Sequence, residues 1–168
     1  RGKLPDIHLA PHGGERFLPD ETISQLKKKG VTILFTTDIA LDEHPEQLKK
    51  AAAFARVIVF DHHKLYHDVT SERILLIKPQ LFTTLDPSKY CSSKLIYDFC
   101  NRHTNLTPYD WIAAVGVISD MTADVWKDFL SQTFQHHSYP AQQLPLAPDY
   151  FNTPIGTISK LISSAEVY

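Results

Sequence analysis

Residues 56–63 read RVIVFDHH, an apolar and largely β-branched run that stops abruptly at one carboxylate and two adjacent imidazoles. The run from Val57 to Phe60 is typical of a buried parallel strand. Open α/β sheets place their ligands beyond the carboxyl ends of the strands, where Asp61, His62 and His63 are expected to emerge. Carboxylate and imidazole together suit divalent ions such as manganese, iron or zinc. The alternative is a pair of surface histidines that follows a strand.

Length and composition indicate one globular domain. A chain of 168 residues can bury a core without disulfides or metals, and its 43% hydrophobic and 21% charged residues are ordinary values. The net charge of −2 provides no broad basic field, so a nucleic-acid substrate would be short or held largely by bound metal ions. The two cysteines are expected to be reduced, and no signal peptide or long apolar span is visible. These features predict a cytoplasmic protein without membrane contact.

A βαβ unit is predicted around the opening stretch. Residues 31–37 form a nearly all-apolar strand that ends at Asp38, and Pro45 then begins a helix that leads to the strand at 57–60. A right-handed crossover makes these two strands parallel, so both end at the same edge of the sheet. The unit therefore predicts that Asp38 lies beside Asp61, His62 and His63.

Further elements extend this unit into an α/β fold with a parallel sheet and flanking helices. We predict strands at 6–10 and 74–77, and helices from Pro19 to the lysines before Gly30, from 92 to 100, from Pro108 to 119 and from 154 to 162. Ser92 or Ser93 is the expected N-cap of the second of these helices. Residues 1–130 form the predicted domain, and 131–168 a polar connector and the start of a further helix. His136 and His137 are expected to be solvent-exposed in that connector.

Three segments in order carry a resemblance to a known family: FTTD at 35–38, VIVFDHH at 57–63 and WIAAVGVISD at 111–120. Together they resemble the DHH phosphoesterase superfamily, closest to RecJ-like exonucleases and oligoribonuclease-type members. Segments at 7–12 and 90–94 also sit where that family has comparable ones. The resemblance implies a doubly wound DHH domain that hydrolyses phosphodiester bonds of single-stranded nucleic acid or short oligonucleotides. It further implies a two-metal site, with Mn²⁺ as the usual ion and Mg²⁺ as the alternative.

The resemblance also implies metal ligands. Asp38 is expected to bridge the two ions, with His62 and Asp120 as further ligands. Two divalent ions about 3.5–4 Å apart can hold both the attacking and the leaving oxygen of an in-line displacement. We expect a hydrogen-bond partner on the other ring nitrogen of His62, because such a partner fixes the tautomer of a ligating histidine.

Catalytic and substrate-binding roles follow from the same resemblance. Asp61 is expected to orient the cluster, and His63 to face the scissile phosphate or the leaving group. A helix N-terminus at Ser92 and Ser93 could help to hold a phosphate, which is the alternative to plain capping.

The chain departs from the family pattern in two respects. The family's first motif, an Asp-x-Asp pair, is absent, and Asp6 and His12 are not convincing substitutes. The C-terminal substrate-binding domain with its Gly-rich histidine motif is also absent; since Arg1 is not methionine, we expect the natural N-terminus to lie upstream. One alternative is therefore a non-catalytic scaffold that binds a replication or repair protein. Another is a phosphohydrolase that acts on cyclic dinucleotides or pyrophosphate.

Overall fold

The structure, a computed structural model, describes residues 17–138 and 149–165. The strand predicted at 6–10 and His12 lie outside the described residues. Among the described residues, none forms a helix that is both long and apolar enough to cross a membrane.

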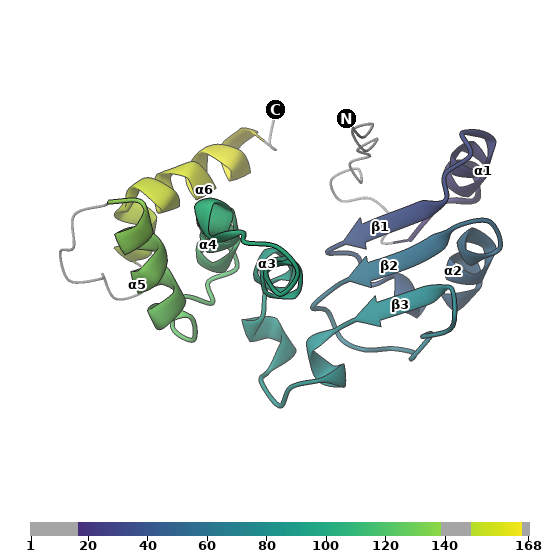
Figure 1. Cartoon of the computed structure of the whole chain (residues 1–168), viewed down its shortest axis with the longest axis horizontal. Helices are drawn as coiled ribbons and strands as arrows, with labels where there is room; N and C mark the ends of the chain where they lie inside the picture. The colour runs from purple at the N-terminus through teal and green to yellow at the C-terminus, as the bar shows by residue number, and fades with distance from the viewer. Residues whose placement is uncertain (1–16, 139–148, 166–168) are drawn as a thin grey trace.

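A three-stranded parallel sheet carries the predicted strands. The strands are β1 (Ile33–Thr37), β2 (Arg56–Phe60) and β3 (Ile74–Ile77), paired side by side in the order β1-β2-β3. Thr37 pairs with Phe60, and Phe60 with Ile77, so the three strands end together. Figure 1 shows the three arrowheads pointing toward the helical part of the molecule. The predicted α/β class and the common edge of β1 and β2 are confirmed.

Helix α2 (Pro45–Ala52) covers one face of this sheet, and α1 (Asp20–Lys28) packs against α2. Leu48 and Ala51 of α2 pack with Val57 and Val59 in one buried cluster. Proline at the first helical position has no amide hydrogen to leave unsatisfied, which explains why α2 begins there. As predicted, α1 ends at its lysines before Gly30, whose φ of 70° suits a residue without a β-carbon.

Among residues 17–138 and 149–165, those packed on the other face lie toward the carboxyl ends of the strands. There Phe60 and Ile77 pack against Leu95 of α3 (Ser92–Asn101). Farther back, Phe35 and Leu75 lie in one row across the sheet, each paired with a residue of β2, and they are 61% and 42% exposed. Helix α3 thus packs against the sheet next to the edge at which the predicted site lies.

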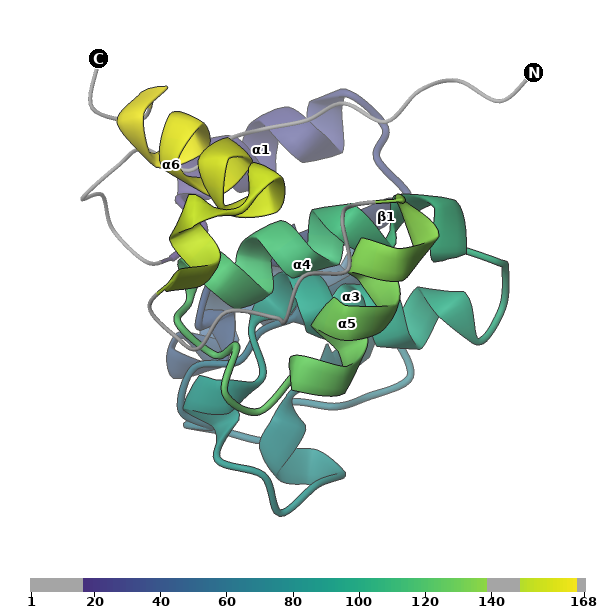
Figure 2. The same cartoon turned by 90° about the vertical axis from the view of Figure 1, so that its left-hand side faces the viewer.

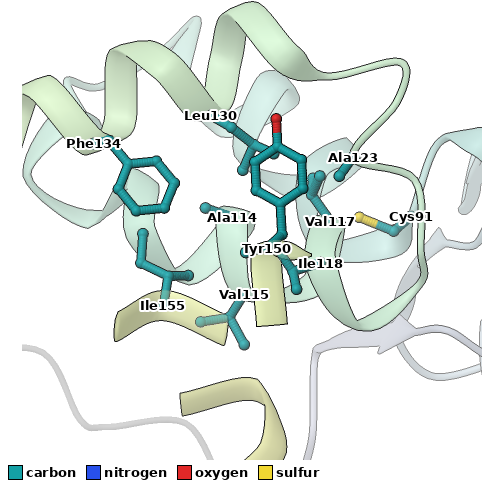
Figure 3. Packing of buried hydrophobic residues seen from close by; sticks show 10 residues of the cluster. All are labelled: Cys91, Ala114, Val115, Val117, Ile118, Ala123, Leu130, Phe134, Tyr150 and Ile155. Carbon is teal, nitrogen blue, oxygen red and sulfur yellow. The ribbon is translucent and has the colours of Figure 1, made fainter. Parts of the chain in front are cut away.

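The remaining helices form a second core around α4 (Asp110–Ser119). Helices α3, α5 (Lys127–His136) and α6 (Pro154–Ala165) all contact α4, which lies between them (Figure 2). Figure 3 shows the side chains that meet in this core. The helix at 154–162 is confirmed by α6. The cluster contains Cys91, Ala114, Val115, Val117, Ile118, Ala123, Leu130, Phe134, Tyr150 and Ile155.

The connector predicted from residue 131 is wrong for residues 131–136, which belong to α5. Thr133 and Phe134 are buried in the helical core, so burial overrides the polar composition of this stretch. His136 Nδ1 and His137 Nε2 each lie 2.7 Å from a carboxylate oxygen of the buried Asp110. The two histidines therefore tie the end of α5 to the start of α4. His136 is exposed, as predicted, whereas His137 is half-buried.

Candidate metal centre

The end of the sheet fixes two acidic residues side by side. Asp38 follows β1, and its backbone N–H donates to the Phe60 carbonyl at 2.9 Å. Asp61 follows β2 and donates in the same way to the Ile77 carbonyl at 3.2 Å. The ladder of the sheet thus continues one residue beyond each strand and holds both backbones at the edge.

Four predicted site residues converge at that edge. His62 Nε2 lies 3.3 Å from Asp38 Oδ1 and 3.9 Å from Asp120 Oδ2. One potential ligand atom from each of Asp38, His62 and His63 lies within 4.8 Å of the other two. The predicted convergence of Asp38 with the two histidines is confirmed, and Asp120 reaches the same place from the end of α4.

Two backbones at this edge adopt a left-handed conformation. Asp38 has φ 62°, and Met121, which follows Asp120, has φ 54°. For residues other than glycine this conformation costs about 1–3 kcal/mol, and such residues are concentrated at functional sites. Each of the two positions turns the chain directly at or beside a carboxylate of the cluster.

The pKa values of Asp38, His62 and Asp120 are shifted because the three side chains are close together and partly buried. The hydrogen bond with Asp38 is the main cause that raises the pKa of the His62 imidazole, although burial opposes that shift. The same contact lowers the pKa of Asp38, helped by the Ser92 hydroxyl. Burial raises the pKa of Asp120, partly offset by the nearby His62. A cation that binds here must compete with a proton on His62, because a metal ligand must be deprotonated.

A buried carboxylate orients His63. The Asp61 side chain is fully buried, and its Oδ1 lies 2.6 Å from His63 Nδ1. The Nδ1 atom is therefore engaged with the carboxylate, and Nε2 is the ring nitrogen left for a ligand. This geometry agrees with the orienting role that the resemblance implies for Asp61.

Sequence reasoning missed two residues below this pair. Lys78, directly after β3, is wholly buried, with its Nζ 2.8 Å from Asp61 Oδ2 and 2.7 Å from Asp42 Oδ1. Asp42 is equally buried, in the short 3-10 helix at Leu41–Glu43. The signal available in the sequence was a lysine directly after an apolar strand and before Pro79, next to the strand that leads to Asp61.

The two serines of α3 have different surroundings. Ser92 is buried, and its hydroxyl donates to Asp38 Oδ1 at 2.9 Å, so it supports a candidate ligand. Ser93 lies at the contact between α3 and α4, with its Oγ 3.4 Å from Cys91 Sγ. Neither serine is the N-cap, since Cys91 holds that position without a side-chain cap. The capping prediction is wrong because Asp38 takes the Ser92 hydroxyl.

The expected partner of His62 is not found in the described part of the chain. His62 Nδ1 is buried without a hydrogen-bond partner among residues 17–138 and 149–165. Burial of an unpaired ring nitrogen costs free energy, so the orientation of this imidazole depends on its contacts with Asp38 and Asp120.

A second cluster of imidazoles lies elsewhere in the molecule. His136 and His137, together with Asn105, Thr107 and Pro108, line an open pocket of about 540 Å³. Their shared partner Asp110 is a residue that the sequence reading did not select. These residues come from the segment that leads into α4 and from the end of α5, whereas the metal centre lies at the edge of the sheet.

The donor set at the edge of the sheet fits a divalent cation. Carboxylate and imidazole donors suit Mn²⁺ and other borderline ions, and Asp38, His62 and His63 are the one group of at least three such donors gathered within the described residues. Asp120 adds a carboxylate close to His62. Comparison with protein-family models and with curated proteins finds no match to this chain.

Proposed function

We propose that this chain is the core of a metal-dependent phosphodiesterase of the DHH type, with a doubly wound α/β fold. The proposed substrates are single-stranded nucleic acids or short oligonucleotides. The single observation that supports the proposal most is the meeting of Asp38, His62 and His63 within 4.8 Å at the edge of a parallel sheet. This is where an open α/β sheet is expected to hold its ligand.

The position of each residue suggests its role, either in binding the cation or in contacting the substrate. Asp38 and His62 would hold a divalent cation, and Asp120 lies close enough to His62 to complete the donor set. Mn²⁺, or Mg²⁺ in its place, would supply Lewis acidity toward a phosphate oxygen when bound. His63, fixed through Nδ1 by Asp61, would present Nε2 to the substrate and pass a proton to the leaving oxygen as its bond to phosphorus breaks.

The donor set supports one cation more readily than two. With His63 facing the substrate, Asp38, His62 and Asp120 remain as donors, whereas the second ion of a two-metal site requires further carboxylates, and the sequence has no Asp-x-Asp pair. We therefore expect the 168-residue chain by itself to show little or no turnover. Robust hydrolysis by this chain would contradict that expectation.

Manganese-dependent hydrolysis of a short labelled oligonucleotide by the full-length protein is the decisive experiment. The substitution His62→Ala should abolish turnover, because it removes the imidazole that contacts both Asp38 and Asp120. The matched control is His103→Ala, because His103 is exposed and lies in the segment that connects α3 to α4. Equal activity of wild type and His62→Ala would remove the catalytic assignment. Parallel reactions with a cyclic dinucleotide and with pyrophosphate separate the alternative substrate classes.

A non-catalytic scaffold is the second candidate. It is favoured by the absence of the Asp-x-Asp pair, and it would act through a replication or repair protein partner. A full-length protein that binds Mn²⁺ yet hydrolyses none of the three substrates would favour this candidate over the enzyme.

A further inference from the structure

We propose that Lys78 is a positioning residue of the candidate metal centre, which fixes both the backbone and the ring of His63. The consequence for catalysis depends on the proposed function, but the positioning itself does not. The inference starts from the burial of the lysine: its side chain is 0% exposed, as are those of Asp42 and Asp61.

Stability does not explain such a lysine. Removing an ion from water costs several kcal/mol even after relaxation, and buried ion pairs can often be replaced by apolar side chains without loss of stability. The neighbouring positions of β3 are apolar, and Ile74, Leu76 and Ile77 are buried. An apolar residue at 78 would extend this core, so the ammonium group requires another explanation.

The first part of that explanation is the backbone that Lys78 holds. Its ammonium donates to the Lys64 carbonyl at 2.8 Å and to the His63 carbonyl at 3.3 Å. Gln80 Nε2 donates to the same His63 carbonyl at 3.1 Å. Two side chains that follow β3 therefore anchor the segment that follows β2 and carries His63.

The second part is the ring of His63. Asp61 uses one carboxylate oxygen for His63 Nδ1, at 2.6 Å, and the other for Lys78 Nζ, at 2.8 Å. Lys78 thus prevents the carboxylate from turning away from the imidazole. The Lys78 ammonium group therefore restrains His63 in two ways: it donates to the His63 carbonyl, and it pairs with Asp61, the partner of the His63 ring.

Asp42 completes the anchor from the opposite side. Its Oδ1 pairs with Lys78, and its Oδ2 accepts the backbone N–H of Tyr66 at 2.7 Å. The segment from His63 to Tyr66 is therefore tied at both ends to one buried charge cluster.

The first test uses the wild-type 168-residue chain, labelled with ¹⁵N, and follows the ring nitrogens of His63 and the ammonium group of Lys78. We expect His63 to show a single tautomer with the proton on Nδ1, and Lys78 to show an ammonium signal protected from exchange with water. A mixture of His63 tautomers, or an ammonium signal that exchanges as fast as those of surface lysines, would overturn the proposal.

The second test compares Lys78→Met with Lys50→Met, a matched control at an exposed lysine that pairs with Asp20. Lys78→Met should produce a mixture of His63 tautomers, while the ring signals of His136 stay unchanged. Lys50→Met should alter neither set of signals. A folded Lys78→Met protein with wild-type His63 signals would contradict the proposal.

Lys78→Met leaves two buried carboxylates without their cation and could unfold the chain. Gln80→Ala is therefore the second variant, because it removes one donor to the His63 carbonyl and leaves the charge cluster intact. Its His63 signals should shift, and unchanged signals would count against the anchor. None of these readouts needs turnover, so absence of hydrolysis by the full-length protein would reject the proposed function while leaving the positioning of His63 separately tested.

Discussion

At the scale of single residues, the candidate centre depends on short contacts between groups that are far apart in the sequence. Ser92 Oγ donates to Asp38 Oδ1 across 54 residues of chain, and His62 lies between Asp38 and Asp120. Each contact limits the rotamers of a candidate ligand before any ion binds. Preorganised ligands lose less entropy on binding, which increases affinity.

Ser92→Ala should weaken Mn²⁺ binding about tenfold, because Asp38 loses the hydroxyl that orients its carboxylate. Isothermal titration calorimetry of the 168-residue chain measures this change. The control is Ser24→Ala, whose hydroxyl donates to the Asp20 carbonyl within α1. Wild-type affinity in Ser92→Ala would show that Asp38 needs no support from α3.

Tyr90 makes the stability of the fold decrease at alkaline pH. Burial, followed by its hydrogen bond to Asp98, raises the pKa of this phenol. The folded chain then keeps a proton that an unfolded tyrosine loses near pH 10, so stability falls as the pH rises above about 10. Tyr90→Phe should cost about 1–2 kcal/mol at pH 8, and this difference from wild type should shrink above pH 10.

Urea unfolding at several pH values measures this difference. The same substitution at Tyr109, whose side chain is 58% exposed, is the control. A constant gap between wild type and Tyr90→Phe from pH 8 to about pH 11 would show that Tyr90 contributes nothing to the pH dependence.

At the scale of elements, the contact between α3 and α4 places Asp120 near the sheet. Helix α3 packs on the sheet through Leu95, and α4 packs on α3 and ends at Asp120. The close approach of the two helices requires Gly116, where an added β-carbon would lie 1.8 Å from Ser93 Oγ. The position of one carboxylate therefore depends on the absence of a side chain four residues earlier.

Gly116→Ala should destabilise the chain by about 1–3 kcal/mol, because the new methyl group overlaps Ser93. The better helix propensity of alanine returns at most about 1 kcal/mol of this loss. The double variant Ser93→Gly/Gly116→Ala should recover part of the stability. A double-mutant cycle by urea unfolding gives the coupling, and additivity of the two changes would place the cause elsewhere.

At the scale of the whole molecule, the centre lies where the sheet meets the helical core (Figure 1). Asp38 and His62 come from the sheet side, and Asp120 from the helical side. A cation bound to all three would link the two cores and stabilise the folded chain over the unfolded one. Mass action sets the size of this stabilisation.

Mn²⁺ at about 100 times its dissociation constant should stabilise the chain by about 2.7 kcal/mol, and thereby raise Tm by roughly 5–10 °C. Thermal unfolding with and without Mn²⁺, followed by addition of EDTA, measures the effect and its reversal. Asp38→Asn should abolish the shift, since it removes a carboxylate from the donor set. Glu46→Gln, at an exposed carboxylate of α2, should retain it. A shift of wild-type size in Asp38→Asn would place the cation elsewhere.

The sequence by itself determined the three strands β1, β2 and β3, most of the described helices and the edge at which the site lies. Apolar β-branched runs that end in polar residues, with a helix between them, leave a parallel βαβ unit as the consistent arrangement, and this brings Asp38 beside His62. Only the tertiary structure decided the partners. Local pattern could not show that Ser92 serves Asp38 instead of capping α3, or that Asp110 holds His136 in a helix. The buried position of Lys78 was equally out of reach, because a buried charge must be neutralised and the carboxylates that neutralise Lys78 are distant from it in the sequence.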